Sequence, residues 1–163
     1  MVPDTMSEST FLIRLAESDD DEFILGLVPR FISFPLPNGR TRTDCLKGIE
    51  ADLVHHLDDQ PSNSYVFVAE NDDGDAVGFL QLQKTKDFFT HRDNCHIANI
   101  AVAEKYEGVG AGKFLLDYAY GWAKEHHCQF VTLAVFPGNE KARDLYVKHG
   151  FDTDLMRLAK PVR

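Results

Sequence analysis

The sequence of 163 residues is poor in cysteine and contains no long apolar run. Its three cysteines, Cys45, Cys95 and Cys128, form no Cys-x-x-Cys pair, which predicts reduced thiols and a cytoplasmic protein. No apolar stretch approaches the roughly 20 residues that a membrane helix needs, so no membrane partner is expected. The N-terminus lacks a basic segment followed by an apolar core, so we expect no secretory signal, and residues 1–9 are expected to fray.

Positive charge is also scarce, because 17 Lys and Arg against 26 Asp and Glu give a formal net charge of −9. This balance disfavours nucleic acid as a partner. Acidic clusters at residues 19–22, 58–59 and 72–75 could steer a cationic acceptor, or could serve only solubility and helix capping. No His-Glu-x-x-His motif and no Cys/His quartet occurs, so no metal is expected.

What the sequence does contain is the composition of one folded domain, expected over residues 1–163, with 44% hydrophobic and 11% aromatic residues. Short β-branched runs predict strands, and apolar residues at helical spacing predict helices. In chain order we expect a strand, two helices, three strands, a helix, a strand, a helix and a last strand. The expected strands cover residues 11–15, 65–69, 76–82, 95–102, 130–136 and 151–162.

The most informative stretch is residues 106–113, Tyr-Glu-Gly-Val-Gly-Ala-Gly-Lys, placed between a strand-like run at 97–102 and a helix expected to begin near Gly110. Alternating glycines allow close backbone approach, and a helix N-terminus offers N–H groups and partial positive charge to a phosphate. The stretch is not a P-loop, because Phe114 follows Lys113, and it lacks the acidic residue of a dinucleotide-binding fold. A glycine-rich turn without a ligand is the alternative.

A second motif follows at residues 136–151, Phe-Pro-Gly-Asn-Glu-Lys-Ala-Arg-Asp-Leu-Tyr-Val-Lys-His-Gly-Phe. Ala142, Leu145 and Tyr146 fall on one helical face, and Gly150 is placed to end the helix. Together the two motifs resemble the GCN5-related N-acetyltransferase (GNAT) superfamily. Its members carry a Gln/Arg-x-x-Gly-x-Gly/Ala loop after the fourth strand, and then an Asn, an Ala and a Tyr before a terminal Gly-Phe.

The resemblance is close over about residues 96–151, and the rest of the chain fits in length and element order. It implies the GNAT fold, an α/β fold with a mixed central sheet of about six to seven strands and helices on both faces. One departure is Glu107, which stands where the family usually has Gln or Arg. A carboxylate there removes a donor beside the expected pyrophosphate, which would weaken a loop that binds mainly through backbone N–H groups.

The resemblance also implies a function: transfer of an acetyl group from acetyl-CoA, a co-substrate, to a primary amine of a small molecule or peptide, by direct attack in a ternary complex. The alternative is a CoA-binding sensor or interaction module of the same fold without catalysis. The residues implied in cofactor binding are Ile100, Ala101 and Val102 along the pantetheine arm, Glu107, Gly108, Val109, Gly110, Ala111, Gly112 and Lys113 at the pyrophosphate, and Asn139, Ala142 and Tyr146.

Two residues are candidates for proton transfer. Tyr146 matches the family tyrosine that protonates the departing thiolate, although a core aromatic is the alternative. An amine of pKa about 10.4 arrives protonated and needs a base, and many relatives use a Glu at the position of Ala98. Strand alternation puts His96 on the same face as Ala98, so His96 could replace that carboxylate or could be structural. Glu70 is a weaker candidate.

The acceptor pocket is less visible in the sequence. Two aromatics in the connection between the first two helices could wall it, or could pack in the core. A turn around residues 88–94 offers further pocket or dimer residues, or only an exposed loop. A homodimer and the use of other acyl groups both stay open. The residues concerned are Phe31, Phe34, Phe88, Phe89, His91 and Arg92.

Overall fold

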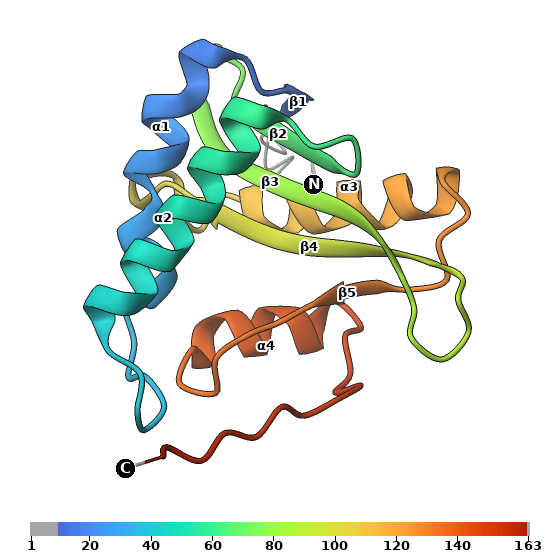
Figure 1. The fold of residues 1–163 in the computed structure, drawn as a ribbon. Helices are drawn as coiled ribbons and strands as arrows, with labels where there is room; N and C mark the ends of the chain where they lie inside the picture. Colours follow the sequence, from blue (N-terminus) through green and yellow to red (C-terminus); the bar gives the residue numbers. More distant parts are fainter. Residues whose placement is uncertain (1–9, 163) are drawn as a thin grey trace, which may run out of the picture.

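The computed structural model describes residues 10–162, so the expectation for residues 1–9 lies outside it. Its strands form one sheet in the order β1-β2-β3-β4-β5 (Figure 1). Neighbouring strands are antiparallel except β4 and β5, which run parallel. The strands are β1 Leu12–Leu15, β2 Ser64–Glu70, β3 Ala76–Lys86, β4 Asp93–Val102 and β5 Val131–Leu133.

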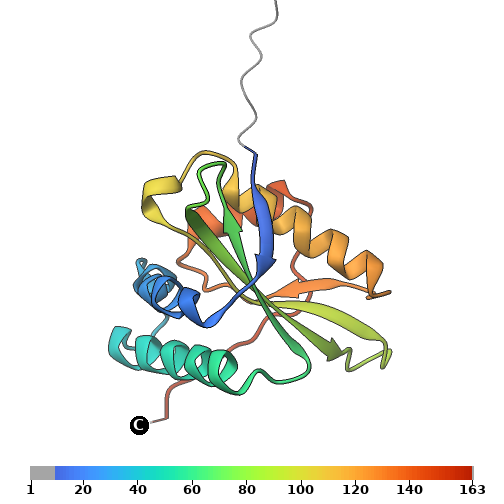
Figure 2. The same cartoon turned by 90° about the horizontal axis from the view of Figure 1, so that it is seen from above.

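Helices cover both faces of this mixed sheet, which confirms the predicted α/β class (Figures 1 and 2). Helices α1 and α2 lie against one face, and α3 and α4 belong to the other. Within the described chain, no helix is both long and apolar enough to cross a bilayer. The helices are α1 Asp21–Gly26, α2 Arg42–Asp59, α3 Ala111–Glu125 and α4 Glu140–Lys148, with the 3-10 helices η1 Ser18–Asp20, η2 Val28–Ile32 and η3 Glu104–Tyr106.

The core is divided by the sheet, because successive side chains of β3 point to opposite faces. Phe79 packs with Ile24 and Leu53 under α1 and α2, and all three side chains are fully buried. Leu80, the next residue, packs with Leu115 of α3 on the other face. The alternation therefore assigns each face of β3 to its own pair of helices.

The hairpin predicted between β2 and β3 is confirmed, and its turn chemistry is visible. The side chain of Asn71 accepts hydrogen bonds from the N–H groups of Asp73 and Asp75 at 3.0 and 2.9 Å. Gly74 has a φ of +80°, a conformation that favours glycine. The turn residues thus dictate where the chain reverses.

The expectation of a last strand at residues 151–162 is wrong, and the described chain has five strands rather than six to seven. The segment leaves α4 and continues without regular structure, with Leu158 87% exposed. It ends beside the turn before α2, where a Cβ on Gly39 would lie 3.0 Å from Pro161. A strand needs a neighbouring strand with which its backbone can form hydrogen bonds. The edge strand β5 is only three residues long, which explains why the tail forms no further strand beside it.

Candidate active site

The centre of the site is the point where β4 and β5 separate. Their pairing runs from Cys95 with Val131 to Ile97 with Leu133, and β4 then continues alone on that side to Val102. A bulge contributes, since Gln81 of β3 faces Asn99 while Leu82 faces Ile97, which leaves Ala98 as the extra residue. The backbone of β4 beyond Ile97 therefore has an open edge, to which an extended ligand can add like a strand.

The glycine loop follows directly at the end of β4. After η3, Gly108 and Gly110 adopt φ values of +78° and +92°, and α3 begins at Ala111. Gly110 is the N-cap and has no side chain to bind the N–H groups of the first turn. These groups and the partial positive charge of a 15-residue helix can bind an anion at this place.

The two sequence motifs lie side by side. A Cβ on Gly112, in the first turn of α3, would lie 3.6 Å from Cδ2 of Leu145 in α4. Helix α4 begins at Glu140 after the N-cap Asn139, whose side chain accepts a hydrogen bond from the Ala142 N–H at 3.3 Å. Gly150, with a φ of +90°, follows its end. The structure therefore places α4 beside the glycine loop.

Glu107, the residue that departs from the family pattern, has two cationic partners. Arg30 of η2 donates a hydrogen bond to Oε1 of Glu107, and Lys141 of α4 lies 3.2 Å from Oε2. These hydrogen bonds, from Arg30 first and Lys141 second, hold the pKa of Glu107 below its ordinary value. Sequence reasoning missed both cations, because they lie 77 and 34 residues from Glu107. Arg30 belongs to neither motif, and nothing in the second motif indicates that its Lys141 pairs with Glu107.

Tyr146 lies on the inner face of α4. Its ring packs against the core under α3, with its centroid 5.8 Å from that of Phe151. Burial raises the pKa of Tyr146 above its ordinary value, so the phenol stays protonated at neutral pH. A protonated hydroxyl is the state that an acid needs.

His96 lies on the face of β4 that is turned toward α2, directly opposite Gln83 of β3. Its Nδ1 is 2.9 Å from the hydroxyl of Thr132 on β5, and burial lowers its pKa below the ordinary 6.5. Gln83, the neighbour of His96 on β3, connects this face to α2, because its Nε2 lies 3.4 Å from Nε2 of His56. A neutral imidazole at neutral pH can accept a proton.

A second set of polar side chains, linked by hydrogen bonds, lies on the same face of the sheet. The Asn99 amide donates to Oε1 of Gln81 at 2.7 Å, and the Gln81 amide donates to Oγ of Ser64 at 3.1 Å. Gln81 is fully buried. The alternation of Gln81 and Gln83 within an apolar strand is a signal that sequence reasoning could have used, because buried glutamines need partners.

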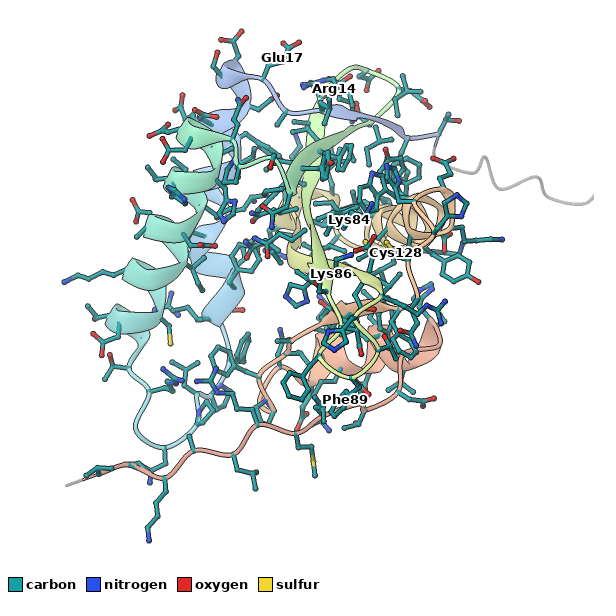
Figure 3. All side chains as sticks on the ribbon, turned by 45° about the vertical axis from the view of Figure 1, so that its right-hand side comes forward. Arg14, Glu17, Lys84, Lys86, Phe89 and Cys128 are labelled. Atoms are coloured by element: carbon teal, nitrogen blue, oxygen red, sulfur yellow. The ribbon has the colours of Figure 1, made fainter. Side chains whose placement is uncertain are left out.

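Glu70, the weaker candidate base, is not part of this arrangement. It ends β2, with β3 between it and β4, and its carboxylate accepts a hydrogen bond from Nε of Arg14. Arg14 of β1, labelled in Figure 3, also binds the buried carboxylate of Asp20 at 2.7 Å. The structure thus engages Glu70 in an ion-pair cluster away from His96.

The aromatics proposed to wall the acceptor pocket have different surroundings. Phe31 packs edge-on against buried Phe79, with centroids 6.1 Å apart, which is core packing. The ring centroid of Phe34 lies 6.0 Å from that of Phe136, which follows β5. Here the connection before α2 meets the loop into α4 so closely that a Cβ on Gly138 would lie 2.1 Å from the Pro35 carbonyl oxygen.

The turn between β3 and β4 lies at the opposite end of β4 from the glycine loop. Phe88 and Phe89 are 83% and 70% exposed there, and Figure 3 shows Phe89 near the tip of this hairpin. His91 and Arg92 belong to the same exposed turn. The structure does not bring these four residues to the glycine loop.

The remaining chemistry-bearing side chains are dispersed. Cys45, Cys95 and Cys128 are all free thiols, and burial raises the pKa of Cys95 to about 12. Across residues 10–162, no group of three or more His, Cys, Asp or Glu side chains is arranged to hold a metal ion.

Comparisons with known proteins are consistent with this geometry. Residues 34–151 match the model of the Acetyltransferase (GNAT) family. A protein of Bacillus subtilis (strain 168) named "Uncharacterized N-acetyltransferase YhfO" is 30% identical over 142 residues, which cover 87% of this chain and 90% of that protein.

Solved structures resemble the chain over nearly its whole length. A putative acetyl transferase from Pyrococcus furiosus gives a TM-score of 0.71 at 22% identity, covering 94% of this chain and 100% of that one. AAC(6')-Iy in complex with the bisubstrate analog CoA-S-monomethyl-acetylneamine gives 0.68 at 20% identity, covering 95% and 99%. At these identities the likeness shows the fold.

Proposed function

Because the chain belongs to the GNAT acetyltransferase family, we propose that it transfers the acetyl group of acetyl-CoA to a primary amine by direct attack in a ternary complex. The observation that carries the proposal is the meeting of three features at one place. These are the open edge of β4, the glycine loop at the N-terminus of α3, and the half-buried Tyr146 on α4.

In this proposal the cofactor lies along the open edge of β4. The backbone of Ile100, Ala101 and Val102 pairs with the pantetheine arm, and an N–H of this strand stabilises the oxyanion that forms on the thioester carbonyl. The amides of the loop 108–113 bind the diphosphate. Asn139 and Ala142, at the start of α4, lie along the same arm.

The proposed reaction begins with the acceptor as an ammonium ion, which must lose one proton to become a neutral nucleophile. His96 accepts the amine proton on Nε2 while its Nδ1–H donates to Thr132, a tautomer that the 2.9 Å contact supports. The neutral amine nitrogen then attacks the thioester carbon, the C–N bond forms, and the C–S bond breaks, while the nitrogen loses its second proton to solvent water. Tyr146 donates its proton to the departing thiolate, whose basicity resembles that of a phenol.

The acceptor in this proposal contacts a polar surface. The α2-facing side of the sheet offers amide and hydroxyl groups of Gln83, Asn99 and Thr132 around His96, which suits an amine that carries further hydrogen-bonding groups. The bound analogue of AAC(6')-Iy joins CoA to an acetylneamine, and another similar fold is named a ribosomal-protein-alanine N-acetyltransferase. We therefore expect a small molecule or a peptide.

Calorimetric titration with acetyl-CoA, followed by thiol release across a panel of polyamines, aminoglycosides and lysine peptides, tests the function. We expect binding, and release with one class of amine. Tyr146→Phe should keep acetyl-CoA affinity and lower kcat by about 10²–10⁴. The matched control is Tyr120→Phe, since Tyr120 is 63% exposed on α3.

Each outcome has a separate meaning. Binding without release for any amine supports the CoA-binding module instead of the enzyme. Unchanged turnover in Tyr146→Phe removes the acid role of this tyrosine while the acetyltransferase assignment stays. Absence of acetyl-CoA binding in the wild type contradicts the proposed function itself.

A further inference from the structure

We propose that Arg30 and Lys141 are diphosphate ligands of acetyl-CoA, and that Glu107 holds both cations beside the loop until the cofactor replaces it. This inference rests on the proposed function and assigns side chains to its phosphate site. It also explains why a carboxylate is tolerated at a position where the family usually has Gln or Arg.

Arg30 and Lys141 hold the Glu107 carboxylate from different sides. The two oxygens of Glu107 are occupied separately, Oε1 by Arg30 and Oε2 by Lys141. The cations come from different elements, η2 before α2 and the first turn of α4. They therefore converge from two sides on the loop that precedes the N-terminal N–H groups of α3.

The cluster of Arg30, Glu107 and Lys141 carries positive charge in an acidic protein. One carboxylate and two cations leave a local charge of +1 at a loop in a chain whose formal net charge is −9. Lys113, the cation within the loop itself, binds Asp117 one turn along α3 at 2.7 Å. Arg30 and Lys141 thus supply the positive charge at this place, and a diphosphate can bind both cations in place of the carboxylate.

Folding stability alone does not account for this cluster of charges. The side chains of Arg30, Glu107 and Lys141 are 29%, 37% and 82% exposed. Ion pairs with this degree of exposure contribute little to folding. A cluster of exposed charges can, however, exchange one anion for another at low energetic cost, because its members remain partly solvated.

The experiment compares two ligands, one with and one without the diphosphate and the 3′-phosphoadenosine attached to it. Acetyl-CoA carries the diphosphate, and S-acetylpantetheine lacks it but keeps the thioester and the arm. Both are titrated calorimetrically into the wild type, Arg30→Gln, Lys141→Gln and Glu107→Gln. Arg40→Gln and Lys148→Gln are the matched controls, because both remove an exposed cation, Lys148 from the end of the same helix α4.

We expect Arg30→Gln and Lys141→Gln each to weaken acetyl-CoA binding about fivefold, the upper end for an exposed ion pair. Glu107→Gln should strengthen it several-fold, because both cations lose their competing carboxylate. Arg30→Lys, which keeps the charge, should retain most of the affinity. The affinity for S-acetylpantetheine should not change in any variant, and neither control should differ from the wild type.

Failure of the inference is distinguishable from failure of the function. If the wild type binds acetyl-CoA and both cation variants bind it equally well, the inference is wrong and the function stands. Equal losses for acetyl-CoA and S-acetylpantetheine also overturn the inference, because they indicate a distorted site rather than lost phosphate ligands. No acetyl-CoA binding by the wild type contradicts the function and the inference together.

Discussion

The proposed cofactor side and the proposed acceptor side of the site are built in different ways. The cofactor side consists of the edge of β4, the glycine loop and α4, and most of its groups are backbone N–H and C=O groups. The acceptor side consists of His96, Thr132, Gln83 and His56, which are side chains from four separate elements.

This difference has a physical consequence. A backbone site depends on local dihedral angles, so a few glycines and a cap residue specify it within a short stretch of sequence. A side-chain site depends on strand register, so each of its members can change without altering the fold. The cofactor side is therefore expected to be common to many relatives, and the acceptor side to be particular to this chain.

The largest effect is expected on the acceptor side. His96→Gln should lower kcat by about 10²–10⁴ at neutral pH and leave acetyl-CoA affinity unchanged, because it removes a base and no cofactor contact. The wild type should lose kcat at saturating acceptor as pH falls below 6.5, since burial lowers the pKa of His96 and protonation abolishes its basicity. Steady-state kinetics across pH measures both effects.

The control for this prediction is His55→Gln, which changes an exposed histidine of α2. It should behave as the wild type at every pH. If His96→Gln keeps its kcat, or shows the same loss of rate below pH 6.5 as the wild type, then His96 is not the base. The assignment of the acceptor side to the surroundings of His96 would then be wrong.

A smaller effect is expected on the cofactor side from Gly110→Val. A branched residue at a φ of +92° is strained, by at least the roughly 1–2 kcal/mol that left-handed geometry costs other residues, so the loop must change shape. We expect acetyl-CoA affinity to fall about tenfold or more, with much of kcat recovered at saturating cofactor.

Gly121→Ala provides the comparison for Gly110→Val. Gly121 lies inside α3 with no atom within 4 Å of an added Cβ, so the change should stabilise the helix by up to about 1 kcal/mol. Its acetyl-CoA affinity should equal that of the wild type. Normal acetyl-CoA binding by Gly110→Val would contradict the proposal that the loop backbone holds the diphosphate.

The smallest effect on activity is expected outside both sides, in the cluster of Arg14, Asp20 and Glu70. Glu70→Gln should leave kcat unchanged and reduce the free energy of unfolding by less than about 1 kcal/mol, because this pair is partly exposed. A large loss of kcat would make Glu70 the base in place of His96.

The same cluster predicts a pH dependence of stability. The hydrogen bond from Arg14 lowers the folded-state pKa of Asp20 below 3.8, so its stabilisation is present above that pH and is lost as pH falls through the lowered value. Urea unfolding of Asp20→Asn should show a smaller stability near neutral pH and a weaker dependence on acid. An acid dependence equal to that of the wild type would contradict this assignment.

Much of the cofactor side could be predicted from sequence. The glycine loop, the start of α4 at Asn139 and its end before Gly150 are local features, and the structure places each where its residues indicate. The hairpin at Asn71 was predictable for the same reason, because side-chain to backbone hydrogen bonds within a few residues specify the turn.

Other features could not be predicted, because they depend on distant pairing. The bulge at Ala98 shifts the alternation of β4 by one residue, which places Asn99 beside Gln81 on the face of His96. Arg30 reaches Glu107 only after α1 and η2 have packed on the sheet. The tail at 151–162 forms no strand, because strand formation needs a partner edge that the tail's own residues do not specify.

The most direct test of the account is the change in amide chemical shifts of the labelled protein on addition of acetyl-CoA. We predict saturable shifts concentrated at residues 100–102 and 108–113 and at the start of α4 near Asn139, with little change at the β3–β4 turn around Phe88. Saturable shifts that avoid the glycine loop, or no shifts at all, would contradict the claim that this backbone is the cofactor site.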